Sequence, residues 1–413
     1  MILEGPVSPE ALAPHFPWAA DMIGCPHDSL YHAEGDPWIH TGMVAAELEK
    51  SQGFSDLPER RRQILRLGAW MHDIAKPATT SVEFCEKEQR ERVRQPRHAP
   101  IGAKMAWQGL IDAGADARLA HDVHALVFWH QRPHHMLGQT HTDIRVIRFA
   151  NAVNDTCWDD LLCLCRADNL GRIAPNIEES IEELELLGLL IDDLYPEFGA
   201  DLRHEPFPFR SADAQLHLMR ATNDKASPWF EPQPAAGSRM LMVSGLPGAG
   251  KNHHLRAHHP DLPVIELDAL RAEMGISPTD NQGRMIQEAF ERARAYLRAG
   301  QDFAWNSTSL SRVARQKIVK LAREYDARID AVSIDVPLDV ARKRNAERSE
   351  PVPDAVLVKL AGKREPIQPD EAHRVTSIDA HGLARDIFCP DAARRMDLAL
   401  PHGESPCNEG VTP

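Results

Sequence analysis

The sequence predicts two domains of different fold class: an all-α domain followed by an α/β domain with a parallel sheet flanked by helices. In residues 1–175 apolar positions recur at helical spacing, and no strand pattern of any length interrupts them. From residue 239, short apolar or β-branched runs alternate with helical segments, which is typical of parallel strands joined by crossover helices. A glycine-rich loop, SGLPGAGKN, follows the first of these runs.

Composition limits the classes of function. The chain has 413 residues, enough for two or three domains with separate cores. Its net charge of −14 argues against a general nucleic-acid coat protein, because binding along a phosphate backbone needs a basic surface. The charge still allows an enzyme that binds the end of a short nucleic-acid strand with a few local arginines.

The expected location is the cytoplasm. The seven cysteines show no CxxC spacing, and the amino end has no secretory leader pattern, which together favour a reducing compartment. No apolar run approaches the roughly 20 residues of a membrane helix. We therefore expect a soluble cytoplasmic protein with no membrane partner.

Between the two domains, residues 176–238 are expected to form a helical segment and a connector. The acidic stretch 177–194 has apolar side chains at three- and four-residue steps, which gives one apolar face that we expect to pack on the preceding domain. Proline, serine and glycine are frequent over 205–238. The α/β domain is expected to span 239–395, and 396–413, which lacks periodicity, to form a flexible tail.

The loop SGLPGAGKN is predicted to bind phosphate. It follows a predicted strand and precedes a predicted helix, as a P-loop requires. Gly245, Gly248 and Gly250 let backbone N–H groups turn toward the phosphates, and Lys251 reaches the β and γ oxygens. The loop therefore predicts ATP or another NTP with Mg²⁺ as ligand. Asn252 stands where a Ser or Thr hydroxyl normally ligates Mg²⁺, so the manner of coordination is left open.

Three further motifs suggest a phosphoryl acceptor. The second strand is followed by DALR, in which Asp268 could accept a hydroxyl proton, with Arg271 beside it; alternatively, Asp268 caps the helix. Polar side chains of WNSTSLSR (305–312) follow the third strand. Arg344 and Arg348 lie one helical turn apart and could close over a transferred phosphoryl group, or could form a solvated basic face.

In this order, GLPGAGK, DALR and RNAER followed by VP resemble the 5′-OH polynucleotide kinase branch of the P-loop phosphotransferases. The resemblance implies that Lys251 holds the donor phosphates and that Asp268 is the general base toward the 5′-hydroxyl. It also implies that Arg271 orients the acceptor strand and that Arg344 and Arg348 form a lid.

The helical domain contains an ordered set of histidines and aspartates. His72 and Asp73 are adjacent in the apolar stretch LRLGAWMHDIAKP, and further candidates occur on both sides of it. The order H…HD…H…H…D resembles the HD phosphohydrolase superfamily, an all-α metal-dependent fold, in its two-metal form. The resemblance implies one metal held by His40, His72, Asp73 and Asp168, with Asp73 bridging to a second metal held by His98 and His130.

This ligand set suits divalent transition metals. Imidazole and carboxylate favour Mn²⁺, Fe²⁺, Co²⁺, Ni²⁺ or Zn²⁺, and two such ions can activate a water and clamp a phosphate. Lys76 could stabilise charge on phosphoryl oxygens, and His32, in YHAEGDPWIHT, is a candidate for substrate contact. The histidines assigned to structural or surface positions are His121, His124, His134, His135, His141, His253, His254, His258 and His259.

A kinase and a phosphohydrolase in one chain would oppose each other on one nucleotide pool, but they are complementary on the two ends of a broken RNA. The domain order and HAEGDPWIHTGMV resemble the bacterial bifunctional RNA end-healing enzymes. The resemblance implies that the first domain removes a 2′,3′-cyclic phosphate or a 2′- or 3′-phosphate and that the second phosphorylates 5′-OH ends. The implied partners are RNA ends and a subsequent RNA ligase. The alternatives are an HD hydrolase gated by a non-transferring nucleotide switch, and a small-molecule kinase with a phosphatase.

Overall fold

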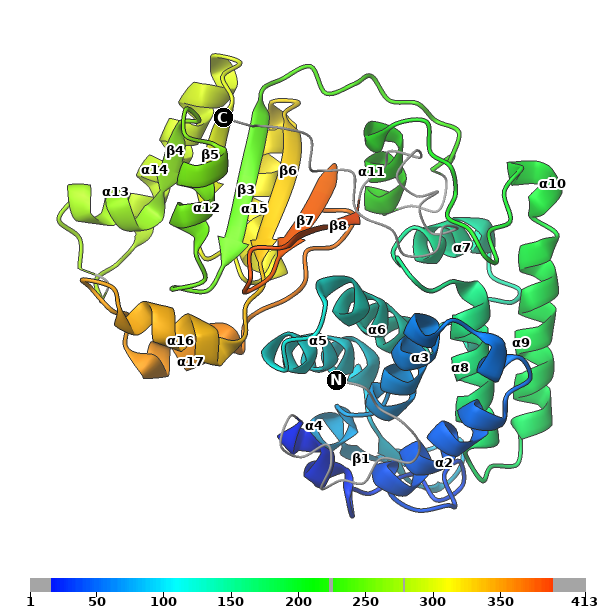
Figure 1. Ribbon diagram of the computed structural model, residues 1–413. Helices are drawn as coiled ribbons and strands as arrows, with labels where there is room; N and C mark the ends of the chain where they lie inside the picture. The colour runs from blue at the N-terminus through cyan, green and yellow to red at the C-terminus, as the bar shows by residue number, and fades with distance from the viewer. Residues whose placement is uncertain (1–15, 223–225, 278, 389–413) are drawn as a thin grey trace.

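The structure is a computed structural model that describes residues 16–222, 226–277 and 279–388, and it contains the two predicted domain classes (Figure 1). The tail expected at 396–413 lies outside these residues. Within the described ranges, no helix combines the length and apolarity needed to cross a membrane. The cysteines in those ranges are free thiols.

The amino-terminal domain is helical and is built around one apolar core. The start of α2 illustrates how its sequence defines a helix: Asp36 Oδ1 accepts a hydrogen bond from Ile39 N at 2.9 Å, and Pro37 takes the first helical position. The helices, with η for 3₁₀, are η1 (Pro17–Met22), α2 (Pro37–Lys50), η2 (Phe54–Asp56), α3 (Glu59–Met71), α4 (Lys76–Thr79), α5 (His98–Asp112), α6 (Ala117–Trp129), η3 (Pro133–His135), α7 (Thr142–Ala150) and α8 (Trp158–Leu170).

One element of this domain was not expected from the sequence. An antiparallel hairpin pairs β1 (Ser81–Cys85) with β2 (Arg90–Arg94). Its strands are short and charged, and Val82 and Phe84 are 58% and 61% exposed. Because the hairpin lies on the surface and buries little apolar area, it lacks the alternation that identifies a strand in a sequence. The helical class of the rest of the domain is confirmed.

The segment after α8 adds three helices to the same domain core. Helix α9 packs on α8, as expected, and buries Leu184, Leu187 and Ile191. The core continues into the predicted connector, where Phe207 and Leu218 are buried. The core thus continues across residue 175, and the domain boundary predicted at that residue stays a prediction. The helices of this segment are α9 (Ile177–Asp192), α10 (Tyr195–Phe198) and α11 (Ala212–Arg220).

The carboxyl-terminal domain is a sheet covered on both faces. In the described residues the sheet has six strands in the order β4-β5-β3-β6-β7-β8, parallel except for the β7–β8 pair. Along β3, Met240 and Met242 enter a core with α14 and α15, whereas Leu241 and Val243 enter a core with α12 and α17. The strands are β3 (Arg239–Gly245), β4 (Val264–Glu266), β5 (Phe303–Asn306), β6 (Arg328–Ile334), β7 (Arg374–Ile378) and β8 (Ala384–Phe388). The helices are α12 (Lys251–His258), α13 (Leu267–Glu273), α14 (Gly283–Arg298), α15 (Arg312–Glu324), α16 (Leu338–Ala346) and α17 (Asp354–Ala361).

The sequence predicted β3 to β6 and did not predict β7 and β8. Of the predicted strands, β4 is a short edge strand whose Val264 is 41% exposed. The other three, β3, β5 and β6, are almost completely buried, as strands covered on both faces must be. By contrast, β8 is an edge strand that begins with exposed residues, and both late strands contain arginine and polar side chains.

The two domains are in contact through α5, α6 and β8. Ala117 of α6 is part of an α/β core cluster, and the ring of His121 lies 5.7 Å from that of Phe388. Arg118 Nε donates a hydrogen bond to the backbone oxygen of Asp386 at 3.0 Å. His121 thus has the structural role that the sequence analysis assigned to it.

Candidate metal centre and nucleotide site

The ends of several helices place a group of histidines and aspartates at one point of the helical domain. His72 and His130 directly follow α3 and α6, and His98 is the first residue of α5. The other members lie inside α2 and α8 or next to His72. All members are buried. The structure therefore brings together His40, His72, Asp73, His98, His130 and Asp168, the full set of metal ligands that the resemblance implied, and we call this set the Asp73 cluster.

Asp73 lies between two subsets of the cluster. One subset with metal-ligand spacing consists of His40, His72 and Asp73, and the other of Asp73, His98 and His130. His72 Nε2 lies 3.1 Å from Asp73 Oδ2, and His98 Nε2 lies 3.3 Å from Asp73 Oδ1. This geometry is the one expected for two ions bridged by a single carboxylate.

The orientation of the rings also fits a cation. All four imidazoles place Nδ1 against a backbone carbonyl, His40 against Gly171 O at 3.1 Å, which directs Nε2 into the cluster and favours the tautomer that ligates a metal. Asp73 Oδ1 is buried and has no hydrogen-bond partner, so it is available as a ligand. The other Nδ1 bonds run from His72 to Ala69, from His98 to Gln95 and from His130 to Val127, at 2.8, 2.8 and 2.7 Å.

The protonation states of Asp73 and His130 agree with this assignment, whereas His40 would have to release a proton when a cation binds. Burial alone would raise the pKa of Asp73, but the neighbouring His72 and Lys76 outweigh it and hold that pKa well below its usual value. Burial lowers the pKa of His130 to about 3, so its ring is neutral at pH 7, as a metal ligand must be.

Glu34 orients the cluster from outside, and the sequence analysis missed it. Its Oε1 lies 3.1 Å from His40 Nδ1 and 2.8 Å from His32 Nδ1, and its Oε2 accepts from Ile173 N at 2.8 Å. Burial lowers the pKa of His40, but the hydrogen bonds to Asp168 and Glu34 prevail and raise it to about 9. The one available signal was the position of Glu34 between two histidines in HAEGDPWIH.

A second layer of cationic or imidazole groups borders the cluster. Lys76 Nζ lies 2.6 Å from Asp73 Oδ2 and 3.1 Å from His27 Nε2, and the ring of His27 lies 4.1 Å from that of His32. His27, His32 and Glu34 also have metal-ligand spacing, but both oxygens of Glu34 already accept hydrogen bonds. Glu34 is therefore already engaged, and His27, His32 and Lys76 form a border around the Asp73 cluster.

The loop between β3 and α12 has the backbone that the glycines predict. Gly248 and Gly250 have φ of +80° and +114°, values that side-chain-bearing residues rarely adopt. Lys251, the first residue of α12, donates from Nζ to the backbone oxygens of Gly245 (2.9 Å) and Leu246 (3.0 Å). Its amine is thus folded over the loop, where nucleotide phosphates would lie.

We expect Gly248→Ala to disrupt the nucleotide site. A Cβ at this position would lie 2.4 Å from Ala341 O and 2.9 Å from Asn345 N, so the loop and α16 must separate. The unfolding free energy should fall by about 1–3 kcal/mol and ATP affinity should be lost, as thermal denaturation and calorimetric titration would measure. The control is Gly275→Ala, which has φ of +63° but no atom within 4 Å of its Cβ, and which should retain affinity. Equal ATP affinity in both variants would contradict this account.

Asn252 is held by its neighbours at the ends of β4 and β5. Its Nδ2 donates to Glu266 Oε1 at 2.5 Å, and its Oδ1 accepts from Asn306 Nδ2 at 2.7 Å. The oxygen that could replace the usual hydroxyl ligand of Mg²⁺ is therefore engaged by Asn306, which is buried. Asn252 joins the P-loop helix to the two strand ends that border the cavity.

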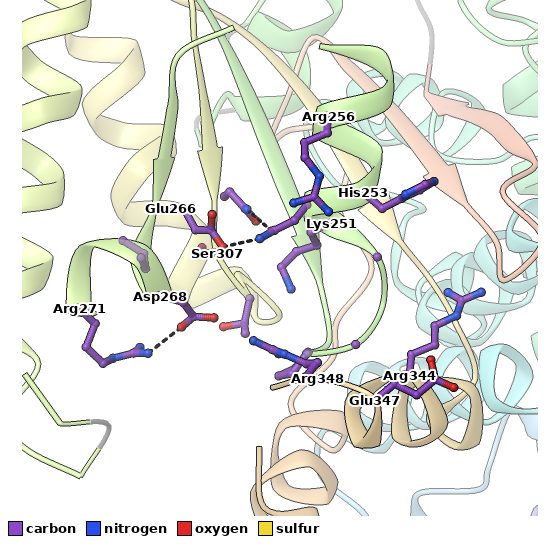
Figure 2. Close-up of a pocket in the computed structure, with 17 residues that line it drawn as sticks. Lys251, His253, Arg256, Glu266, Asp268, Arg271, Ser307, Arg344, Glu347 and Arg348 are labelled. Atoms are coloured by element: carbon purple, nitrogen blue, oxygen red, sulfur yellow. Dashed lines mark hydrogen bonds and ion pairs between the residues drawn. The ribbon is translucent and has the colours of Figure 1, made fainter. Parts of the chain in front are cut away.

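A cavity of about 550 Å³ opens beside the loop (Figure 2). Asp268 and Arg271 line it and are ion-paired through Asp268 Oδ1 and Arg271 Nη1 at 2.7 Å. The Asp268 side chain is 60% exposed and accessible to an acceptor hydroxyl. The capping alternative for Asp268 is wrong, because α13 begins at Leu267 and its cap position is Glu266.

The two lid arginines differ in their surroundings. Arg344 lines the cavity and donates to the backbone oxygens of Ala249 (3.0 Å) and Ala380 (2.7 Å), so it holds the P-loop in place. Arg348 lines the cavity on the side that faces Lys251 (Figure 2). Asn306, Ser307 and Thr308, polar residues of the predicted WNSTSLSR motif, line the cavity too, and the lining residues to which the sequence analysis gave no role include His253, Arg256, Glu266 and Glu347. Of these, His253 had been assigned to a surface position; it is exposed and also lines the cavity.

Comparison with known proteins gives a family match for each domain. The family model of the HD domain matches residues 38–173, and that of the AAA domain matches residues 240–367. No curated protein matches the chain. Among solved structures, a gluconokinase from Sinorhizobium meliloti 1021 is 22% identical over 36% of this chain and 84% of that chain, with a TM-score of 0.26, and such a likeness carries no functional inference. The chain thus contains a region similar to HD domains followed by a region similar to AAA domains that carries the P-loop.

Proposed function

We propose that the chain repairs both ends of a broken RNA strand. The helical domain removes a 2′,3′-cyclic phosphate or a 2′- or 3′-phosphate, and the α/β domain transfers the γ-phosphate of an NTP to a 5′-hydroxyl. The observation that carries the proposal is the exposed carboxylate of Asp268 at a P-loop cavity, in the same chain as the Asp73 cluster. A nucleotide sensor needs no proton acceptor beside its P-loop.

In the proposed transfer, the 5′-oxygen forms a bond to the γ-phosphorus while the bond to the β–γ bridging oxygen breaks and NDP leaves. Asp268 takes the hydroxyl proton, and Arg271 holds both that carboxylate and the acceptor strand. Lys251 and Arg348 neutralise charge on the transferred group, while Arg344 fixes the loop through Ala249. Mg²⁺ bound with the nucleotide would supply further charge neutralisation.

In the proposed hydrolysis, a water oxygen bonds to phosphorus, one ester P–O bond breaks, and the ribose oxygen leaves with a proton. Two divalent ions in the Asp73 cluster would lower the pKa of that water and polarise the phosphate. The residues that we assign to the phosphate oxygens are Lys76 and His32, with His27 supporting both. Glu34 keeps His32 and His40 in orientation.

RNA ends, rather than long RNA, are the proposed partners. The net charge of −14 opposes binding along a strand, whereas Arg256, Arg271 and Arg348 concentrate positive charge at the nucleotide cavity. Binding should therefore weaken as salt rises and should depend little on RNA length. The repaired ends, a 3′-hydroxyl and a 5′-phosphate, are substrates for an RNA ligase, which we propose acts next in the cytoplasm.

A single RNA substrate tests both activities. A short RNA with a 5′-OH and a 2′,3′-cyclic phosphate is incubated with the full chain, ATP or GTP, Mg²⁺ and Mn²⁺, and both ends are followed by mass spectrometry. We expect gain of one phosphate at the 5′ end and loss of the cyclic phosphate at the other end. Omission of NTP should stop only the gain of phosphate at the 5′ end. Treatment of the protein with a chelator, followed by addition of Mg²⁺ without Mn²⁺, should reduce the loss of the cyclic phosphate.

Two other outcomes would favour the alternatives. If the RNA is unchanged while nucleosides or sugars are phosphorylated, and excess oligonucleotide does not compete, the chain is a small-molecule enzyme. If nucleotide binds, no phosphate is transferred and hydrolysis proceeds, the α/β domain is a switch. The observation that favours the switch is the engagement of Asn252 by Asn306 where a metal-ligating hydroxyl is usual.

A further inference from the structure

Helix α5 joins the helical domain to the kinase-like site. Lys104, Gln108 and Asp112 are spaced by four residues and therefore lie on one face of α5, whereas the opposite face is buried in the domain core. All three contact the segment of the α/β domain between 336 and 365. Lys104 Nζ lies 3.3 Å from Glu365 Oε1, and Gln108 Nε2 donates to the backbone oxygens of Gly362 (3.2 Å) and Arg364 (2.6 Å).

Asp112, the last residue of α5, makes the most specific of these contacts. Its Oδ1 accepts a hydrogen bond from Leu338 N, at the start of α16, at 2.9 Å. Its Oδ2 pairs with Arg364 Nη2 at 2.6 Å, and Arg364 is itself buried. A carboxylate at the amino end of a helix satisfies a free N–H group and opposes the helix dipole. The helical domain therefore supplies the N-terminal cap of α16.

The position of α16 in turn determines the shape of the nucleotide site. The backbone oxygen of Ala341 lies so close to Gly248 that only glycine fits there. Arg344 holds the loop through Ala249 O, and Glu347 and Arg348, which directly follow α16, line the cavity. A displacement of the amino end of α16 would move the P-loop support and Arg348 together.

We propose that Asp112 is a positioning residue for nucleotide binding, through which the HD domain fixes α16 against the P-loop. The inference rests on the proposed function only in that the loop binds a nucleotide; it does not depend on which acceptor is phosphorylated. The same helix begins at His98 of the Asp73 cluster, so one rigid element of 15 residues, roughly 22 Å long, connects the two sites.

The test is calorimetric titration of the full chain with ATP and with GTP, each with Mg²⁺ and without an acceptor. Asp112→Ala should weaken binding of the preferred nucleotide roughly tenfold, the factor that corresponds to loss of a helix cap. Asp112→Asn should weaken binding less, because its amide oxygen can still accept from Leu338 N. The matched control is Lys104→Ala, which removes a half-buried pair from the same interface without touching α16 and should bind as the wild type does.

Two further readouts separate positioning from general damage. With a phosphoryl acceptor, Asp112→Ala should raise the KM for NTP and leave kcat within about twofold, since the catalytic groups are intact. Hydrolysis of bis-p-nitrophenyl phosphate with Mn²⁺ should be equal in all variants. Wild-type nucleotide affinity in Asp112→Ala, or equal loss in Lys104→Ala, would overturn the inference. If wild-type protein binds nucleotide but phosphorylates no RNA, the proposed function fails and this inference stands on the titration alone.

Discussion

Asp73→Ala is expected to abolish phosphate release from RNA ends while 5′-phosphorylation continues. Asp73 is the one residue shared by the two metal-ligand subsets, and its free Oδ1 is buried between them. Its loss should remove both ions and, with them, the several kcal/mol that bound metal contributes to charge stabilisation, a loss of activity on the order of a thousandfold. The measurement is release of the cyclic phosphate from the RNA together with the metal content of the purified protein.

The control for this prediction is Asp193→Ala, which removes a carboxylate at an exposed position at the end of α9. It should retain both metal content and hydrolysis. Asp73→Asn should behave like Asp73→Ala in metal content, because a neutral amide is a weak ligand and leaves the adjacent Lys76 ammonium unpaired. An active Asp73→Ala protein that still holds two ions would exclude the Asp73 cluster as the catalytic centre.

The sequence predicts residues that are defined by local chemistry better than those defined by tertiary packing. The P-loop glycines can be recognised because a phosphate loop needs particular backbone angles, and Gly248 and Gly250 have such angles. The members of the Asp73 cluster can be recognised because histidine and aspartate recur in a known order. Glu34 could not be recognised in this way, because its role depends on helices that bring His40 and Ile173 to it.

The same distinction applies to elements of the fold. Strands β3, β5 and β6 are buried on both faces and can be recognised in the sequence as largely apolar runs, whereas the surface hairpin and edge strand β8 have mixed composition. Asp112 gives no signal at all in the sequence, because its partners Leu338 and Arg364 lie more than 200 positions away, at separations of 226 and 252. Asp268 was expected at the end of the second strand, but β4 ends at Glu266 and Asp268 is the second residue of α13, a difference that depends on where the helix begins.

Lys251→Ala should have the opposite effect to Asp73→Ala: loss of 5′-phosphorylation with hydrolysis of the cyclic phosphate retained. The Lys251 amine donates hydrogen bonds to the loop oxygens of Gly245 and Leu246, which belong to the P-loop itself, so its removal should spare the fold. Loss of its charge beside the transferred phosphoryl group should lower the transfer rate on the order of a hundred- to a thousandfold. The control is Lys317→Ala, an exposed lysine of α15 that does not line the cavity.

The pH dependence of nucleotide binding provides a second measure of the same lysine. Burial, opposed by Asp268 and Glu266 and assisted by Arg348, lowers the pKa of Lys251 to about 8. Because the cationic amine binds phosphate, and bound phosphate favours the cation, ATP affinity should fall as pH rises through 8, by up to about tenfold per pH unit. In Lys251→Ala this dependence should be absent, and the affinity should already be low at pH 7. Calorimetric titrations between pH 7 and pH 9 would test this, and an identical pH dependence in the two proteins would show that the group that titrates is not Lys251.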